Sequence, residues 1–299
     1  MMKIFLFLVF IFTQHVGCAL ASEDIWVIAH RGASGTAPES SRYAYEQALA
    51  LPVDYLEGDI QRTQDGVLVI FHDALLGSDT NIEHVFPQRR EENIETFTWA
   101  ELQQLKSGKW FNIVNKDLAK PEFEEATVLS LEDLLKTLSP KKGPGLYLET
   151  KRSFIHQGIE NQLVDLLRKY GWLEPTLPNA KPRVVFQSFE KQSLARLQEL
   201  APHIPRVLLV SPSLINILGA EGIVKEAQEV DAYGVGPAGH LCWPWNIKTW
   251  HNANLVVHAY TLNHPWQFRI MAMAGVDGMF TDHPKRLLEY VKSDINKTQ

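Results

Sequence analysis

Four apolar runs of this sequence end in ionisable side chains, and those side chains are the ones that could do chemistry. In an α/β barrel the carboxyl ends of the strands form the active face, so polar residues at these points are the first candidates for a site. The four runs are Trp26-Val27-Ile28-Ala29 before His30-Arg31, Tyr55-Leu56 before Glu57-Gly58-Asp59, Leu68-Val69-Ile70-Phe71 before His72-Asp73, and Leu146-Tyr147-Leu148 before Glu149-Thr150-Lys151.

Three of these side chains are carboxylates whose spacing indicates a cation site. Glu57 and Asp59 are two residues apart, so on a strand both leave the same face, and Glu149 adds a third carboxylate. Inward carboxylates repel one another unless a cation lies between them; the alternatives are that they face solvent or pair with an arginine. Ligation by oxygen alone suits Ca²⁺ or Mg²⁺ better than zinc, and the export that we expect from the N-terminal segment described below favours Ca²⁺.

Two histidines accompany the carboxylates. A lone histidine after a strand is more often a packing residue, but His30 and His72 each end an apolar run. Such a pair could divide acid–base work, since imidazole titrates near neutral pH: one takes a proton from the nucleophile and the other protonates the leaving oxygen. Asp73 could fix a tautomer. Which histidine is the acid and which is the base stays open.

Two cations complete the set of candidates. Arg31 could hold a phosphate oxygen with two parallel hydrogen bonds, and Lys151 offers a second positive charge. Each could instead form a surface salt bridge. Together with a metal ion they would neutralise a phosphodiester and stabilise its transition state.

The elements that must position these residues alternate between short apolar strands and amphipathic helices. This alternation predicts a single (β/α)8 TIM barrel over residues 22–299. The expected strands are Trp26–Ala29, Tyr55–Ile60, Leu146–Thr150, Val184–Gln187, Val207–Val210, Ala232–Val235, Leu255–Tyr260 and Gly278–Phe280, and the expected helices include Glu39–Leu49, Gly158–Arg168, Lys191–Leu200, Pro265–Ala274 and Pro284–Val291.

One connection interrupts the alternation after the second strand region. Residues 74–125, approximately, are polar and irregular, with a single expected helix around Trp99–Leu105. Connecting segments of this length are usually lids over an active site or small inserted subdomains. The alternative is a solvent-exposed segment with no role at the site. Phe86, Trp110 and Phe111 favour a lid that contacts substrate.

The N-terminus has the layout of a signal peptide, with Lys3, an apolar run from Ile4 to Phe12 and small residues before Ala21. The run is too short for a stable membrane span, which needs about 20 apolar residues. We expect cleavage after residue 21 and a periplasmic or secreted protein. An uncleaved anchor is an alternative, and lipid attachment at Cys18 is less favoured because His15 stands where a small apolar residue is expected.

Composition narrows the class of protein further. The formal charge is −6 and no basic stripe occurs, which argues against nucleic-acid binding and leaves a small anionic molecule as the expected partner. Only Cys242 remains after cleavage at residue 21, so the mature chain has no internal disulfide. Cys242 is expected to be a packed residue.

An ordered set of motifs resembles the glycerophosphodiester phosphodiesterase family over nearly all of the chain after the signal segment. The motifs are Ala29-His30-Arg31-Gly32, Ala37-Pro38-Glu39, Leu56-Glu57-Gly58-Asp59-Ile60-Gln61, Thr63 through Asp65-Gly66, Phe71-His72-Asp73, Glu149-Thr150-Lys151, Tyr260-Thr261-Leu262-Asn263 and Gly275 through Asp282-His283-Pro284.

The resemblance implies a metal-dependent barrel enzyme that hydrolyses glycerophosphodiesters, such as glycerophosphocholine and glycerophosphoethanolamine, to glycerol 3-phosphate and an alcohol. It implies the following residue roles: His30 and His72 as the acid–base pair, Glu57, Asp59 and Glu149 as ligands of the divalent cation, Arg31 and Lys151 as phosphate contacts, and Glu39, Asp73 and Tyr260 as supporting residues.

Three positions depart from the family pattern. Ser40 stands where Asn is usual, Gly58 replaces a bulkier residue, and Tyr260 stands where many members have Trp. The side chain at position 58 points away from the barrel interior, so altered packing is expected there and not loss of metal binding.

Three functions could be carried out by a protein with these residues. The first is the hydrolase just described, with attack by water or by a substrate hydroxyl that gives a cyclic intermediate. The second is a phospholipase of the same barrel that acts on intact lipid headgroups and docks through an apolar rim of Trp243, Trp245 and Trp250. The third is a barrel that only binds phosphodiesters; it predicts a missing histidine or carboxylate, and none is missing.

Overall fold

The computed structural model describes residues 25–175 and 180–298. The predicted signal peptide, residues 1–21, lies outside these residues. No helix in the described ranges is both long and apolar enough to cross a membrane.

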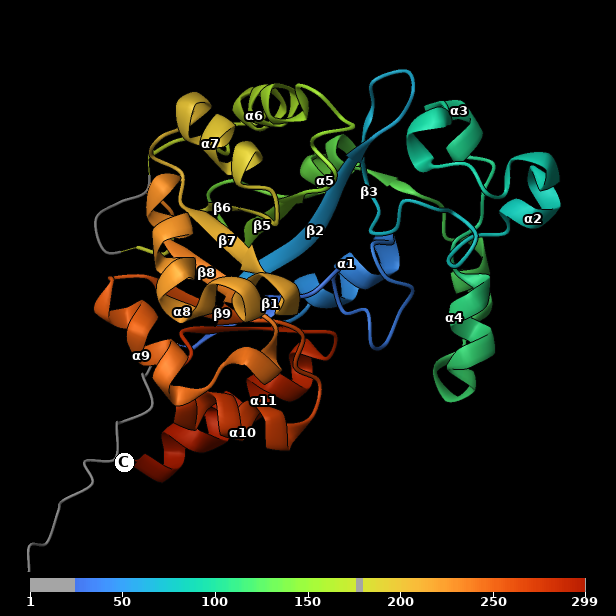
Figure 1. Cartoon of the computed structure of the whole chain (residues 1–299). Coiled ribbons are helices and arrows are strands. Elements are labelled where there is room, and N and C mark those ends of the chain that lie inside the picture. The colour runs from blue at the N-terminus through green and yellow to red at the C-terminus, as the bar shows by residue number, and fades with distance from the viewer. Residues whose placement is uncertain (1–24, 176–179, 299) are drawn as a thin grey trace, which may run out of the picture.

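Eight parallel strands close into a barrel (Figure 1). Each strand pairs with its neighbours, and β1 closes the ring because it pairs with both β2 and β10. The predicted (β/α)8 barrel is therefore confirmed. The barrel strands are β1 (Trp26–Ala29), β2 (Tyr55–Arg62), β5 (Gly145–Thr150), β6 (Val184–Ser188), β7 (Arg206–Val210), β8 (Gly234–Pro237), β9 (Val256–Ala259) and β10 (Gly278–Thr281).

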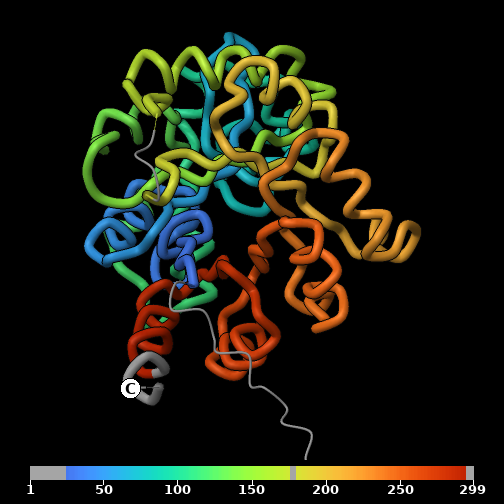
Figure 2. The backbone as a smooth tube through the Cα atoms, turned by 90° about the vertical axis from the view of Figure 1, so that its left-hand side faces the viewer, coloured from blue at the N-terminus to red at the C-terminus, as the bar shows by residue number. Residues whose placement is uncertain are grey.

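Helices cover the outside of this ring. They are α1 (Arg42–Leu49), α5 (Leu131–Thr137), α6 (Ile159–Lys169), α7 (Lys191–Leu200), α8 (Pro212–Glu229), α9 (Pro244–Asn252), α10 (Pro265–Ala274) and α11 (Pro284–Thr298). Figure 2 shows the red C-terminal helix beside the blue start of the chain, as the pairing of β10 with β1 requires. The helices bury apolar faces on the strands; α6, for example, buries Leu163, Val164 and Leu167.

The first helix begins later than the sequence predicted. Ser41 caps α1, since its hydroxyl accepts a hydrogen bond from the amide of Ala44, and the helix starts at Arg42 and not at Glu39. Ser40 has a left-handed φ of 53°, which a helix cannot contain. Because the chain turns at Ser40, Glu39 lies outside the helix and accepts a hydrogen bond from Arg31.

The segment between β3 (Leu68–Ile70) and β4 (Leu129–Ser130) lies beside the barrel (Figure 1). Strand β3 pairs antiparallel with both β2 and β4, so this segment extends the sheet outward. The single helix expected here was an incomplete prediction, because the segment's helices are short and lack a long amphipathic period. They are α2 (Ile82–Val85), α3 (Trp99–Leu102), α4 (Lys109–Val114) and the 3₁₀ turns η1 (Pro87–Arg89), η2 (Ile94–Thr96), η3 (Lys116–Leu118) and η4 (Pro121–Glu125).

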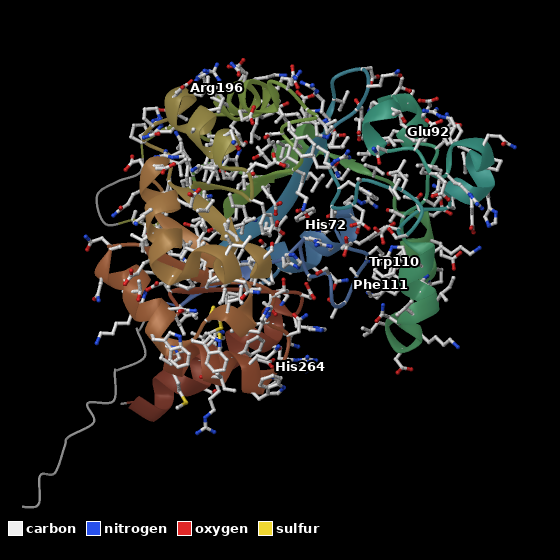
Figure 3. The ribbon with its side chains drawn as sticks, in the orientation of Figure 1. His72, Glu92, Trp110, Phe111, Arg196 and His264 are labelled. Atoms are coloured by element: carbon white, nitrogen blue, oxygen red, sulfur yellow. The ribbon has the colours of Figure 1, made fainter. Side chains whose placement is uncertain are left out.

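The aromatic residues of this segment pack on its own structure. Phe111 is fully buried against Phe123, and Phe86 contacts Phe97. Figure 3 shows Trp110 and Phe111 on the barrel-facing side of α4. None of Phe86, Trp110 and Phe111 lines the cavity described below, so the expected contact of these three with substrate stays a prediction.

The barrel interior is lined by aromatic and apolar side chains towards the amino ends of its strands and by polar side chains towards their carboxyl ends. Tyr55 and Tyr147 meet edge to face with ring centroids 5.7 Å apart, and Phe280 packs on Tyr147. Two residues further along β2 and β5, the same inner faces carry Glu57 and Glu149. A layer of buried aromatic rings therefore lies directly beneath the carboxylates.

Candidate functional site

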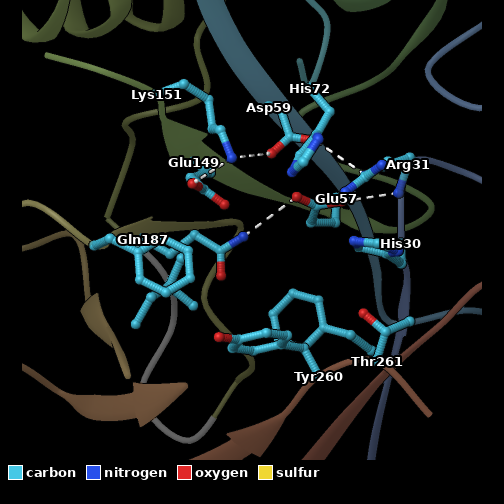
Figure 4. Close-up of a pocket in the computed structure, with 13 residues that line it drawn as sticks. His30, Arg31, Glu57, Asp59, His72, Glu149, Lys151, Gln187, Tyr260 and Thr261 are labelled. Atoms are coloured by element: carbon cyan, nitrogen blue, oxygen red, sulfur yellow. Dashed lines mark hydrogen bonds and ion pairs between the residues drawn. The ribbon is translucent and has the colours of Figure 1, made fainter. Parts of the chain in front are cut away.

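A cavity of about 220 Å³ opens at the carboxyl ends of the barrel strands (Figure 4). The structure brings together in it every residue predicted as catalytic, metal-binding or phosphate-binding. Tyr260 also lines the cavity directly, whereas Glu39 and Asp73 lie behind it. The lining residues are His30, Arg31, Glu57, Asp59, His72, Glu149, Lys151, Gln187, Phe189, Leu209, Tyr260, Thr261 and Phe280.

Strand register aligns the carboxylates. Asp59 on β2 pairs with Glu149 on β5, and Glu149 pairs with Gln187 on β6, so three neighbouring strands present one row of side chains. Glu57 lies two residues before Asp59 on the same inner face. Glu57, Asp59 and Glu149 each offer a carboxylate oxygen, and these atoms lie within 4.8 Å of one another.

The electrostatics of this triad fit a cation. Burial raises the pKa of Glu57 well above its usual value, and the charge of Asp59 adds to this effect. Burial and Asp59 likewise raise the pKa of Glu149 to about 8. Without a cation these two carboxyls therefore tend to keep their protons, because two more negative charges in an enclosed site are costly.

Asp59 stays ionised within the same cluster. Burial alone would raise its pKa, but the positive charges of Lys151 and Arg31 outweigh burial and lower the pKa to about 2. Its Oδ2 atom is buried and accepts no hydrogen bond. The Nε atom of Arg31 lies 3.3 Å from this oxygen but forms no hydrogen bond with it. An ionised, buried oxygen that accepts no hydrogen bond is an available metal ligand, so the residues present fit a divalent ion.

Two cations contact the carboxylates from the sides. Nζ of Lys151 lies 3.1 Å from Oε1 of Glu149 and 3.6 Å from Oδ1 of Asp59. The Arg31 guanidinium donates to Glu39 at 2.8 Å, and its Nε lies 3.3 Å from Oδ2 of Asp59. Two positive side chains thus face three carboxylates, and the fully ionised site would repel a phosphodiester anion. A bound divalent cation reverses that balance.

His30 is held by a carboxylate that the sequence reasoning did not select. Its Nδ1 donates to Oδ1 of Asp282 at 2.7 Å, and the hydroxyl of Ser34 donates to the same oxygen at 3.0 Å. Asn263 donates to Oδ2 of Asp282 at 2.6 Å and accepts from the Asp282 amide at 2.9 Å. With Nδ1 engaged, Nε2 is the His30 nitrogen free for proton transfer.

His72 has the same arrangement with its sequence neighbour. Its Nδ1 donates to Oδ1 of Asp73 at 2.6 Å, as the sequence predicted, and Ser78 donates to Oδ2 of Asp73 at 2.9 Å. Gln61, fully buried on β2, donates to the carbonyl oxygens of Phe71 and Asp73 at 2.8 Å and thereby fixes this loop. Burial lowers the pKa of His72, which favours the neutral imidazole that can accept a proton.

Three of these supporting residues were missed by the sequence reasoning. Asp282 follows the apolar strand β10 directly, which is the same signal that selected the other candidates, and so it could have been found. Gln187 donates to Oε1 of Glu57 at 3.3 Å, and Asn263 holds Asp282. An amide carries no charge, so these two had no comparable signal in the sequence.

The departures from the family pattern have local explanations. A side chain at Gly58 would approach the Tyr45 hydroxyl to 2.9 Å, and that hydroxyl donates to the carbonyl of Glu57 at 2.9 Å. Glycine therefore makes room for a buried tyrosine outside the barrel. The left-handed φ of Ser40 is adopted more readily by Asn, which accounts for Asn being usual at this position.

This chain is similar to known proteins over most of its length. The model of the Glycerophosphoryl diester phosphodiesterase family matches residues 30–286. A glycerophosphodiester phosphodiesterase of Bacillus subtilis is 32% identical over 270 residues, which are 90% of this chain and 87% of that protein.

Solved structures of other proteins have the same barrel fold as this chain. A phosphodiesterase of Oleispira antarctica, solved with the product sn-glycerol-3-phosphate, has a TM-score of 0.72 and 25% identity, covering 90% of this chain and 97% of that one. A glycerophosphodiester phosphodiesterase of Agrobacterium tumefaciens has a TM-score of 0.67 and 23% identity, covering 89% of this chain and 99% of that one.

Proposed function

We propose, from the premise that this chain belongs to the glycerophosphoryl diester phosphodiesterase family, that it hydrolyses glycerophosphodiesters to glycerol 3-phosphate and an alcohol. One observation carries the proposal: two histidines, three carboxylates and two cations line a single cavity at the active face of the barrel. Glycerophosphocholine and glycerophosphoethanolamine are the substrates we expect, because each carries a small phosphodiester group, whose negative charge this cavity would bind once it holds a divalent cation.

Glu57, Asp59 and Glu149 would hold the divalent cation. A cation bound there would polarise a phosphate oxygen and neutralise part of the negative charge of the diester. Ca²⁺ is the ion we favour and Mg²⁺ the alternative, because every ligand is an oxygen. Arg31 and Lys151 would contact the remaining phosphate oxygens from either side of the triad, since both already lie against its carboxylates.

His30 and His72 would move the protons. Each donates from Nδ1 to an aspartate and leaves Nε2 for the reaction. One neutral imidazole takes a proton from the attacking hydroxyl, whether of water or of the substrate itself, and the other, protonated, gives its proton to the departing alkoxide. The P–O bond to the alcohol breaks as the new P–O bond forms, so overall one water is consumed.

The test is release of choline from glycerophosphocholine by the purified mature protein. We expect a chelator to abolish turnover and Ca²⁺ or Mg²⁺ to restore it. His30→Asn and His72→Asn should each lower kcat by about 10²–10⁴-fold. His251→Asn is the matched control, because His251 forms an equivalent 2.9 Å pair with Asp277 and lines no part of the cavity. Turnover that survives chelation, or both histidine substitutions, would contradict the proposal.

We further propose that the protein is exported after cleavage following residue 21. The proposal rests on the sequence layout alone, because that segment lies outside the described residues. Mass spectrometry of the protein recovered from the periplasm or medium should give a mature N-terminus at Ser22. An N-terminus at Met1, or an acylated Cys18, would overturn it.

A further inference from the structure

A small cavity lies where the barrel meets the inserted segment, residues 71–128 between β3 and β4. Its volume of about 10 Å³ has room for one water molecule or one ion. It shares no lining residue with the catalytic cavity. The loop after β1 and strand β3 form one side of it, and the inserted segment forms the other. We call it the junction cavity.

Every polar side chain in the junction cavity carries oxygen. No described Lys, Arg or His side chain lines it. A set of oxygen atoms of this kind, with two carboxylates among them, is the donor set that hard cations prefer. The carboxylates are those of Glu39 and Asp79, and the hydroxyls are those of Ser40, Ser107 and Thr127.

Ser40 shows that a partner is needed in this cavity. The residue is only 5% exposed, and its Oγ atom is buried and forms no hydrogen bond. Buried hydroxyls in proteins almost always have a partner, because a buried polar group without one is destabilising. An unpaired hydroxyl beside two carboxylates in a space of this size indicates a bound molecule or ion.

The two carboxylates are only partly neutralised by the protein. Oε1 of Glu39 accepts a hydrogen bond from Arg31 at 2.8 Å, but Nε of Arg31 also lies 3.3 Å from Asp59, so two carboxylates share this one positive charge. Asp79 accepts from the Ser78 hydroxyl at 3.0 Å and has no ion pair among the described residues. Burial raises the pKa of both Glu39 and Asp79, and the charge of Asp79 adds to the effect at Glu39. A cation between them would remove this repulsion.

We propose that the junction cavity binds one Ca²⁺ ion, which joins the inserted segment to the barrel. Glu39 and Asp79 would supply the charged ligands, and the Ser40 hydroxyl would supply a neutral one. Mg²⁺ fits less well, because it usually keeps several of its waters and this cavity has room for about one. The ion is separate from the one that Glu57, Asp59 and Glu149 would hold.

An ion in the junction cavity would act on the supports of both Arg31 and His72. The Ser78 hydroxyl has one hydrogen and lies 2.9 Å from Oδ2 of Asp73 and 3.0 Å from Oδ2 of Asp79. With Asp79 bound to a cation, that hydrogen goes to Asp73, which holds His72. On the barrel side, Glu39 holds Arg31. One ion would therefore connect the two loops that position these side chains.

Calorimetric titration of the mature protein with Ca²⁺ separates this site from the catalytic one. We expect two Ca²⁺ ions per wild-type chain. Asp79→Asn should weaken one of the two sites at least about tenfold, because a charged ligand is lost, and Glu149→Gln should weaken the other. Asp117→Asn is the matched control, because Asp117 is an exposed residue of the inserted segment that lines neither cavity; both sites should keep their affinity.

Tb³⁺, which replaces Ca²⁺ and emits light when a nearby tryptophan is excited, locates the ion independently. Trp110 lines the junction cavity from the barrel-facing side of α4 (Figure 3), and no tryptophan lines the catalytic cavity. Trp110→Phe should therefore remove most of the emission and leave the two calorimetric sites unchanged.

Two results would overturn the inference. One is a wild-type chain that binds a single Ca²⁺ ion, lost in Glu149→Gln and retained in Asp79→Asn, which assigns the junction cavity to water and leaves the proposed function standing. The other is equal Tb³⁺ emission from wild type and Trp110→Phe, which places the second ion elsewhere.

Discussion

Replacing Asp282 by Asn tests whether a carboxylate positions His30 for proton transfer. Asp282 accepts three hydrogen bonds from side chains, from His30, Ser34 and Asn263. An amide can accept only on its oxygen. Whichever way this amide is turned, its NH₂ group faces a side chain that donated a hydrogen bond to Asp282. In both orientations the negative charge beside His30 is lost.

The size of the effect follows from the bond to His30. A hydrogen bond to a charged group contributes about 1.5–3 kcal/mol, and the bond here is short at 2.7 Å. It gains strength when His30 becomes positively charged during the reaction. Since about 1.4 kcal/mol corresponds to a factor of ten in rate, Asp282→Asn should lower kcat about 10- to 100-fold. Asp282 does not line the cavity, so KM should change less than about threefold.

The assay is steady-state release of choline from glycerophosphocholine, with thermal unfolding to verify that the variant is folded. Asp277→Asn is the matched control. Asp277 lies at the amino end of β10, where it accepts from His251 at 2.9 Å and from the Val257 amide at 2.7 Å, while Asp282 lies at the carboxyl end of the same strand. A kcat for Asp282→Asn within threefold of wild type would refute the positioning role. An equal loss in Asp277→Asn would show that the effect is structural.

Three further predictions concern stability and charge. Burial raises the pKa of Asp282, but hydrogen bonds from His30, Asn263 and Ser34 lower it to about 2; the carboxylate therefore stabilises the fold above about pH 4 and loses this effect as the pH falls towards 2. Urea titrations should show an advantage of wild type over Asp282→Asn that shrinks by roughly 2 kcal/mol between pH 6 and pH 2, and a constant difference would contradict it. Lys151→Met should lower kcat/KM about 10²–10³-fold, because it removes a positive charge that would contact the phosphate. The same substitution should tighten Ca²⁺ binding measured by calorimetry, because it removes a cation that lies 3.1 Å from Glu149. Weaker Ca²⁺ binding would count against this reasoning. Arg152→Met should cost about 2–4 kcal/mol in urea unfolding, since its two bonds of 3.0 and 3.1 Å to Glu95 tie the β5 loop to η2, whereas the exposed Arg168→Met should cost under about 1 kcal/mol.

The barrel could be predicted because its signals are local. A buried parallel strand needs a short apolar run, and a covering helix needs an apolar stripe, so strands such as Trp26–Ala29 and helices such as Lys191–Leu200 were found with their bounds. The segment between β3 and β4 resisted prediction because its α-helices are four to six residues long and its 3₁₀ turns are three to five residues long. Such short helices are fixed by contacts like that of Phe111 with Phe123, which join different turns of the segment and have no periodic pattern in the sequence.

The predicted apolar rim shows the same limit. Trp243 and Trp245 are exposed as expected, but Trp250 is fully buried and its indole donates to the carbonyl of Ala220. The sequence places three tryptophans close together and does not say which way each one faces. An apolar cavity beside the site depends on the direction in which Trp243 faces. Trp243 lines this cavity together with α10, which comes from another part of the chain.

By itself the sequence determined the reactive groups: a histidine, a carboxylate or a cation at the end of an apolar run is visible without coordinates, and His30, Glu57, Asp59, His72, Glu149 and Lys151 were all found in this way. Only the tertiary structure decided what surrounds them. Closure of the barrel by pairing of β1 with β10 brings Asp282 to His30 across 252 positions, and register sets Gln187 beside Glu149. Hydrogen bonds and burial depend on distance in space, and only the closed barrel fixes that distance.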